Sequence, residues 1–255
     1  MPLGLNFGLG LSAQRAPAAG YDNDAQAYFD AMTTPPNAAR KALLNALITG
    51  WKADGDWALI GYIALLASHD EQAARINVKN PAQIATAVGT LPFTVDRGFT
   101  GDGLSGYLET GVADNAMPNW TQDTGCIFAW VNQAPLVGGA AVGLSNLSST
   151  RLQITPLAPT ARLHNTTNVA GTTTNSVGLC SGVRVDSTTT RMYRNGALEG
   201  TATTGAAAAT TAGTFQFFRS NGVFLDARLA VAGAGGLVDQ AKFYARLATY
   251  LAALA

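Results

Sequence analysis

A calcium site built from loop residues is the first chemistry that the residue types of this sequence allow. Four residues with carboxylate or amide side chains occur in Gly- and Asn-rich stretches that predict loops: Asp102, Asp114, Asn115 and Asp123. Loop carboxylates and carbonyl oxygens are common ligands of Ca²⁺. The same residue types also form turns, so the sequence leaves two interpretations open, a Ca²⁺ site and a set of turns. No other cofactor is expected.

Trp120 is the candidate residue for contact with a sugar. It follows Pro118 and Asn119 in AMPNWTQD, a stretch that is typical of a loop. A tryptophan exposed in a loop offers a flat apolar face on which a sugar ring can stack. The alternative is that Trp120 covers one end of the protein core, which we favour because single apolar residues near the surface are common.

The sequence lacks the motifs of the common hydrolases. The only glutamates are Glu71, Glu109 and Glu199, each isolated, and no predicted strand carries the alternating carboxylates of a β-sandwich glycosidase. The two histidines, His69 and His164, have no HExxH spacing, and no serine lies in a GxSxG motif. Aspartates from distant parts of the chain could still pair in space. We nevertheless predict that the protein is not an enzyme and has no catalytic residues.

The segment Gly101 to Gly106, GDGLSG, satisfies the GxGxxG pattern of dinucleotide-binding proteins. That pattern binds a pyrophosphate only where a strand precedes it and a helix follows it. Here the pattern is followed by YLETG, which is typical of a strand. Nucleotide binding is therefore not predicted.

Composition argues against nucleic acid and membranes as partners. The chain has 255 residues, of which 47% are hydrophobic and 13% charged, and its sixteen basic and sixteen acidic side chains cancel. This is enough apolar material for one large domain, with or without a smaller appendage, but it provides no excess of positive charge to attract a polyanion. Cys126 and Cys180 lie in apolar runs, which predicts buried free thiols, while a single disulfide bond between them stays open.

Short strand-like runs dominate the chain after Pro81. They are rich in β-branched and aromatic residues, are separated by Gly, Asn, Thr and Pro, and include GCIFAWVNQ, RLQITPL and TFQFFRS. Such spacing indicates an antiparallel sandwich or jelly roll. Asn195-Gly196 is the strongest turn signal, because this pair tolerates the positive φ angles of a two-residue hairpin. Residues 81–255 are thus predicted to form a mainly β domain that ends in a helix.

Helical periodicity precedes the β region, over residues 21–80. Asp22 or Asn23 can cap a first short helix, and Pro35-Pro36 prevents its continuation. A second helix is predicted from one apolar face, with Gly50 and Gly55 near its end. The face consists of Ala39, Leu43, Leu44, Leu47, Ile48 and Trp51.

Three further helices are predicted. Residues 56–67 are almost wholly apolar and predict a buried third helix, while Ser68 is the expected N-cap of a fourth, with Glu71 three residues later. The last lies in LVDQAKFYARLATYLAAL at the C-terminus, where the apolar residues recur with helical spacing.

The first twenty residues, MPLGLNFGLGLSAQRAPAAG, alternate apolar residues with Gly and Pro. We predict an arm over residues 1–20 that becomes ordered against another protein, with five candidate docking residues: Leu3, Leu5, Phe7, Leu9 and Leu11. A terminal strand of the chain's own sheet is an equal alternative. The arm lacks the features of a signal peptide, and the longest apolar run, Trp57 to Ala67, is too short to cross a bilayer. We therefore expect a protein that is made and retained in the cytoplasm, or that leaves it by a route other than secretion.

Four stretches of the β region, in order, resemble concanavalin A-like and laminin-G-like jelly-roll domains: FTGDGLSGYLETG, CIFAWV, VRVDSTTTRMYRNGALEGT and FQFFRSNGVFLDARLAVAGAG. The central hairpin of that family carries a Y-x-N-G turn, here Tyr193 to Gly196, and a late strand carries the pattern of Gly222 to Ala227. The resemblance runs from about Phe93 to the C-terminus and implies an antiparallel jelly-roll sandwich. The family's metal and sugar ligands have no matching signature here and are not carried over.

The helical preface AYFDAMTTPPNAARKALLNALITGWKADGDW, with ALLASHDEQAARINVKNP after it, is similar to an arrangement in virion proteins of tailed bacteriophages, where helices precede a laminin-G-like domain. This resemblance implies a virion structural protein of fibre, spike or decoration type. Its partners would be other virion proteins, copies of itself, with a trimer favoured, and host surface glycans. Two alternatives stay open: a lectin or glycan-active enzyme on the same scaffold, and an interaction domain without a ligand.

Overall fold

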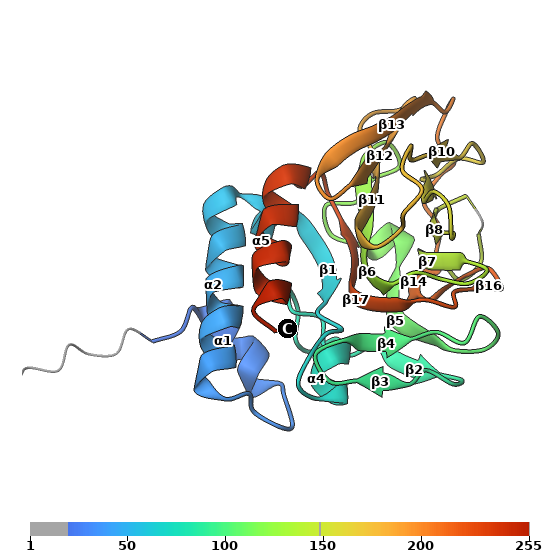
Figure 1. The fold of residues 1–255 in the computed structure, drawn as a ribbon. Helices are drawn as coiled ribbons and strands as arrows, with labels where there is room; N and C mark the ends of the chain where they lie inside the picture. The colour runs from blue at the N-terminus through green and yellow to red at the C-terminus, as the bar shows by residue number, and fades with distance from the viewer. Residues whose placement is uncertain (1–19, 148, 255) are drawn as a thin grey trace, which may run out of the picture.

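The computed structural model describes residues 20–147 and 149–254, which form three layers (Figure 1). Helices lie against one face of an eight-stranded sheet, and a seven-stranded sheet packs on its other face. We call these the covered sheet and the exposed sheet. The fold is mainly β, an antiparallel sandwich with an early helical segment and a C-terminal helix, as the sequence predicts.

The covered sheet has the strand order β13 (Ala197–Thr203), β12 (Thr189–Arg194), β11 (Gly178–Arg184), β6 (Gly125–Gln133), β17 (Arg228–Gly235), β4 (Gly98–Thr100) and β3 (Phe93–Thr94), and β1 (Ile60–Ala64) also pairs with β17. The exposed sheet has the order β10 (Val169–Ala170), β9 (Thr160–Arg162), β8 (Arg151–Ile154), β7 (Gly139–Leu144), β14 (Thr214–Phe217), β5 (Tyr107–Ala113) and β2 (Thr86–Val88). A small hairpin of β15 (Arg219–Ser220) and β16 (Val223–Phe224) forms a separate pair.

The helices are α1 (Asn23–Asp30), α2 (Ala38–Asp54), α3 (Asp56–Leu59), α4 (Glu71–Arg75), the short 3-10 helix η1 (Asp114–Ala116) and α5 (Gln240–Ala252). In the part of the chain that the structure covers, none of them is long and apolar enough to cross a membrane.

Two hydrophobic cores hold the layers together. One lies between the sheets, and the other lies between the covered sheet and the helices. Strand β6 serves both, because alternate residues of a strand face opposite sides: Ile127 belongs to the first core and Phe128 to the second. Phe128 contacts Phe243 of α5 edge to face, with ring centroids 4.8 Å apart, and Phe243 stacks on Trp51 of α2 at 5.6 Å.

The predicted N-cap of the first helix and the predicted end of the second are confirmed. Asp22 caps α1, where its side chain accepts a hydrogen bond from the backbone N–H of Asp24. Asn37 caps α2 in the same way, and α2 ends at Gly55, whose φ of 85° lies in the left-handed region that suits glycine.

Two helix predictions are wrong. The run at residues 56–67 forms only the single turn α3 before it continues as strand β1, in which all five residues are buried. In a short apolar run that is buried on both sides, the hydrophobic pattern does not distinguish a helix from a strand. Here the run forms a strand because it pairs with β17. The cap of α4 is Asp70, whose carboxylate accepts from the N–H groups of Gln72 and Ala73, and not Ser68.

The Asn195-Gly196 hairpin and the free cysteines are confirmed. Strands β12 and β13 pair across this turn, and both residues have positive φ, 48° and 79°. Cys126 and Cys180 are buried and free. Burial raises the pKa of each thiol to about 12, so neither is a ready nucleophile.

Candidate functional site

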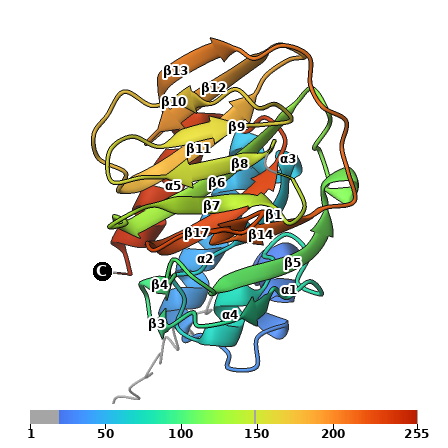
Figure 2. The same cartoon turned by 90° about the vertical axis from the view of Figure 1, so that its right-hand side faces the viewer.

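The helical layer leaves the outer face of the exposed sheet uncovered (Figure 2). Strand β8 shows how the sequence builds this face. Leu152 and Ile154 are buried in the core between the sheets, whereas Arg151 and Gln153 alternate with them and are half-buried on the outer side. Along β8, the side chains that face outward are therefore polar, and those that face the core are aliphatic.

The register of the exposed sheet aligns a row of residues across six strands. Each member pairs directly with the next, in the order Arg162, Arg151, Gly143, Gln216, Glu109 and Thr86. Side chains that face each other in neighbouring strands are close enough to interact. We call these six residues the polar row.

The centre of the polar row is fixed by packing. Gly143 leaves room for the β15–β16 hairpin, since a Cβ atom at this position would lie only 2.3 Å from the Cβ of Ser220. Beside it, Gln216 is buried and donates a hydrogen bond from its side-chain amide to Oε2 of Glu109, over 2.7 Å. The only carboxylate in the polar row is thus held by a neighbour from the adjacent strand.

An aromatic pair borders the polar row. Tyr107, two residues before Glu109 on β5, lies with its ring centroid 6.2 Å from that of Phe224 on β16. The guanidinium carbon of Arg219 lies 4.7 Å from the Tyr107 centroid and 5.3 Å from the Phe224 centroid, within the range of cation–π attraction. The outer face therefore combines polar groups with half-exposed aromatic rings.

Two loops at the edge of the sandwich are held by aspartates. Asp102 accepts hydrogen bonds from the N–H groups of Leu104, Ser105 and Gly106 and from the Ser105 hydroxyl. The Gly106 N–H and the Ser105 hydroxyl contribute most to holding the pKa of Asp102 well below its usual value. The GxGxxG segment is thus a carboxylate-centred turn, and strand β5 follows it, not a helix.

Asp226 holds the neighbouring loop between β6 and β7. Its carboxylate accepts from the N–H groups of Leu136, Val137 and Gly138, at 3.0, 2.9 and 2.9 Å. Burial opposes ionisation of Asp226, but these N–H groups outweigh it and lower its pKa. The tips that the two loops present are apolar, with exposed fractions of 80% for Leu104, 90% for Leu136 and 83% for Val137.

Replacing Asp226 with asparagine is expected to lower the free energy of unfolding by about 2 kcal/mol, because an amide cannot accept all three charge-assisted hydrogen bonds. Urea denaturation measures this loss, and limited proteolysis at residues 134–138 should become faster. Asp123→Asn is the matched control, since Asp123 is exposed and its hydrogen bond is made by its backbone N–H. Equal stability of both variants would contradict the role given to Asp226.

Trp120, the candidate for sugar stacking, is buried, with an exposed fraction of 7%. Its ring packs edge to face on Phe215, with centroids 5.2 Å apart, and its indole Nε1 donates to Oδ1 of Asp114 at 2.5 Å. The side chain covers one end of the core, so the favoured alternative holds and the exposed-loop prediction is wrong. Local sequence could not show that Phe215, from a distant strand, lies beneath the ring.

The candidate metal ligands have separate roles. Asp102 binds its own loop, and the buried carboxylate of Asp114 accepts from Trp120 and from the N–H of Thr211. Asn115 donates its backbone N–H to Thr211, and Asp123 is exposed. Within residues 20–147 and 149–254, no group of three or more His, Cys, Asp or Glu side chains could hold a metal ion. Calcium binding therefore stays a prediction for which the described side chains provide no cluster.

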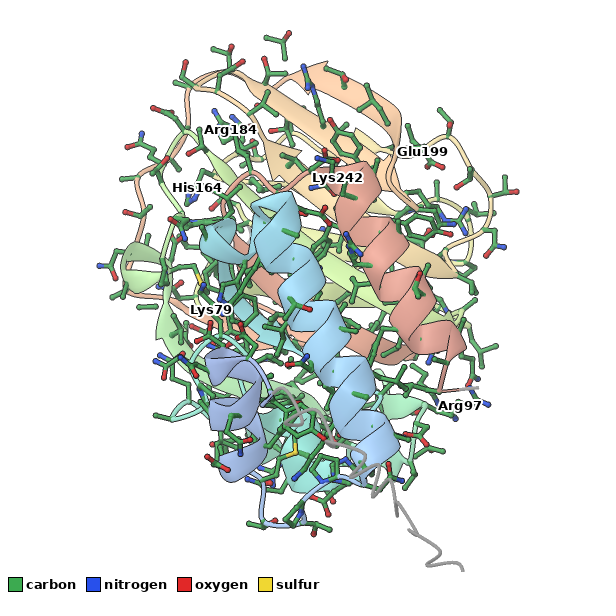
Figure 3. All side chains as sticks on the ribbon, turned by 90° about the vertical axis from the view of Figure 1, so that its left-hand side faces the viewer. Lys79, Arg97, His164, Arg184, Glu199 and Lys242 are labelled. Carbon is green, nitrogen blue, oxygen red and sulfur yellow. The ribbon has the colours of Figure 1, made fainter. Side chains whose placement is uncertain are left out.

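A buried polar cluster lies behind Trp120. His164 is buried with its Nε2 3.7 Å from Oδ1 of Asp114, and burial, followed by the charge of Arg184, lowers the pKa of His164 to about 4. Arg184 is fully buried and donates to the carbonyl oxygens of Leu163, Ser187 and Gly205. His164 and Arg184 lie on the same side of the molecule (Figure 3). Because these groups are enclosed by protein, we assign them a structural role at this end of the sandwich.

The polar row is not among the residues that the sequence motifs indicate. The alternation in RLQI and in TAR does indicate from the sequence that Arg151 and Arg162 face away from a core. The alignment of residues from six strands depends on the register, which local sequence does not show. The candidate docking residues Leu3, Leu5, Phe7, Leu9 and Leu11 lie outside the described residues.

Comparisons with known proteins support the fold alone. No protein-family model matches the chain, and no curated protein matches its sequence. The binding domain of Paraclostridial Mosquitocidal Protein 1 is similar in structure, with a TM-score of 0.57, 8% identity, and coverage of 76% of this chain and 53% of that one. The receptor binding domain of botulinum neurotoxin C/D mosaic serotype has a TM-score of 0.53, 8% identity, and coverage of 75% and 52%.

A Trypanosoma rangeli sialidase gives a TM-score of 0.48 with 11% identity, over 82% of this chain and 39% of that one. The chain thus spans about half or less of the length of these solved chains. The class that the fold defines is a β-sandwich of the jelly-roll-like kind, backed by a layer of helices. These likenesses do not bear on the resemblance to phage virion proteins.

Proposed function

We propose that this protein is a non-enzymatic virion structural protein of a tailed bacteriophage, of fibre, spike or decoration type. In this proposal, residues 1–20 bind other virion proteins, and the outer face of the exposed sheet contacts glycans on the host surface. The observation that supports it is the asymmetry of the layers. Helix α1, which follows the arm, lies in the helical layer, whereas the exposed sheet, which carries the polar row, lies on the other side of the covered sheet (Figure 1).

The chemistry of the outer face suits a sugar. Sugars present hydroxyl groups around a ring with apolar C–H faces, so they bind where polar side chains border an aromatic surface. The half-buried Glu109 is fixed by the hydrogen bond from the buried Gln216, and Tyr107 and Phe224 provide half-exposed rings beside it. Little conformational entropy would be lost when such a preorganised face binds a ligand.

A lectin that acts alone is the second candidate. The solved structures that share the fold include domains described as binding and receptor binding domains, which favours a binding role in general. A glycan-active enzyme is less favoured. Glycosidases of the common type need two carboxylates, whereas the polar row contains one, Glu109.

The full-length protein is expected to bind at least one glycan class on an array. Combining Tyr107→Ala with Glu109→Gln should weaken this binding about tenfold or more, because one aromatic contact and one charge-assisted hydrogen bond are lost. Glu199→Gln, on β13 of the covered sheet, is the matched control. Absence of any glycan binding, or equal binding by the double variant, would contradict the glycan role.

Light scattering should give the mass of a trimer, and a monomer would argue against a fibre.

A further inference from the structure

Two arginines face each other on the outer face without an acidic partner. Arg151 of β8 and Arg162 of β9 are paired directly in the register of the exposed sheet, and both are half-buried. Within the described part of the chain, neither belongs to an ion pair with Asp or Glu. Like charges directly opposite one another in a sheet repel, so this pair is unfavourable until something compensates the charge.

Each of the two guanidinium groups also has a buried nitrogen atom that lacks a hydrogen-bond partner. The Nε atoms of Arg151 and Arg162 are both buried without a hydrogen-bond partner. Burial, and then the charge of Arg151, lowers the pKa of Arg162, and burial also lowers that of Arg151. A bound anion would supply acceptors for the guanidinium groups and would offset the repulsion between them.

The strands hold the pair in place. Leu152 of β8 and Ala161 of β9 are buried in the core and lie next to the two arginines along their strands. Gln153 and Thr160 form the next pair on the same face, and both are half-buried. A planar guanidinium forms two parallel hydrogen bonds with a carboxylate or a sulfate group. The amide and the hydroxyl beside the pair can bind hydroxyl groups of the same ligand.

We propose that Arg151 and Arg162 together bind a carboxylate or sulfate group of an acidic glycan, with Gln153 and Thr160 contacting adjacent sugar hydroxyls. This inference rests on the proposed function, because it names the kind of glycan that the outer face would select. The chain has no net charge, with sixteen basic and sixteen acidic residues. Attraction to an acidic glycan would therefore come from this local pair and not from the protein as a whole.

The test uses the full-length protein and two charge-matched double variants. R151Q/R162Q removes the pair, and R97Q/R191Q removes two positive charges elsewhere, from the exposed Arg97 and from Arg191 on β12 of the covered sheet. R151K/R162K keeps both charges but removes the planar guanidinium groups, and it serves as a second probe if the glutamine variant does not fold. Binding is measured to heparin, to polysialic acid and to neutral dextran, at low and high salt.

We expect the wild type to bind heparin or polysialic acid but not dextran, with weaker binding at high salt. R151Q/R162Q should bind about tenfold more weakly or worse, because the charged hydrogen bonds are lost. R151K/R162K should fall between, because it keeps the charges and loses only the bidentate hydrogen bonds. R97Q/R191Q should bind as the wild type does. Equal binding to the acidic glycans by wild type and R151Q/R162Q would overturn the inference.

Inorganic sulfate separates failure of the inference from failure of the proposed function. If sulfate raises the thermal midpoint of the wild type and of R97Q/R191Q more than that of R151Q/R162Q, while no glycan binds, the anion site is supported and the glycan role is contradicted. If neutral glycans bind through Tyr107 and Glu109 and the arginine variants are unaffected, the glycan role stands and the anion inference falls. General salting effects of sulfate act on all variants, so the difference between them is the measured quantity.

Discussion

Trp120→Ala is expected to lower the free energy of unfolding by about 3–5 kcal/mol, the usual cost of truncating a buried aromatic residue. The indole ring fills the space over Gly125, where an added Cβ atom would lie 2.3 Å from the Trp120 ring, and it packs on Phe215. Loss of the indole N–H also deprives the buried carboxylate of Asp114 of one donor. The thermal midpoint should fall by about 10 °C for a chain of this size.

Urea denaturation and calorimetry measure this effect, with Trp130→Ala as the control. Trp130 is half-buried and stacks on Tyr244 of α5, with centroids 5.7 Å apart, so its truncation should cost clearly less. Trp120→Phe should have an intermediate effect, because the ring is kept and the N–H is lost. A Trp120→Ala variant as stable as the wild type, but deficient in glycan binding, would restore the interpretation of Trp120 as a sugar contact.

Lowering the pH from about 6.5 to about 4 is expected to cost up to about 3 kcal/mol of stability through His164. Burial, together with the charge of Arg184, lowers the pKa of this histidine from 6.5 to about 4, with Asp123 acting in the opposite direction. Between these two pH values the unfolded chain binds a proton at His164 and the folded protein does not. The contribution is therefore fully present above pH 6.5 and is lost as the pH falls.

The pH dependence of urea denaturation in the wild type and in His164→Asn isolates this contribution. Position 164 has a φ of 50°, which asparagine tolerates better than most residues. The variant should be less stable at neutral pH, since packing is lost, but its stability should fall less steeply between pH 6.5 and 4. Burial raises the pKa of Asp114, which acts in the opposite direction at acid pH and is retained in both proteins. Equal slopes would contradict the assignment to His164.

The helices near the N-terminus show what local sequence can predict. Asp22 and Gly55 mark the ends of α1 and α2 because the chemistry of capping involves residues within one turn of each other. The Asn195-Gly196 turn is predicted for the same reason, since only the two turn residues need positive φ. Local sequence does not predict the structure of residues 56–67, because their strand β1 forms only through pairing with β17, far along the chain.

The sequence alone determined the mainly β class, the antiparallel sandwich, the cap of α1, the end of α2, the Asn195-Gly196 hairpin and the burial of both cysteines, because each depends on residue type, alternation or spacing within a short window. Only the tertiary structure decided that Trp120 belongs to the core and that Asp102 and Asp226 hold loops. It also decided that Arg151 and Arg162 lie opposite each other in the polar row. These features depend on strand register and on contacts between residues far apart in the chain, and a one-residue shift in register would turn every side chain of a strand to the other face.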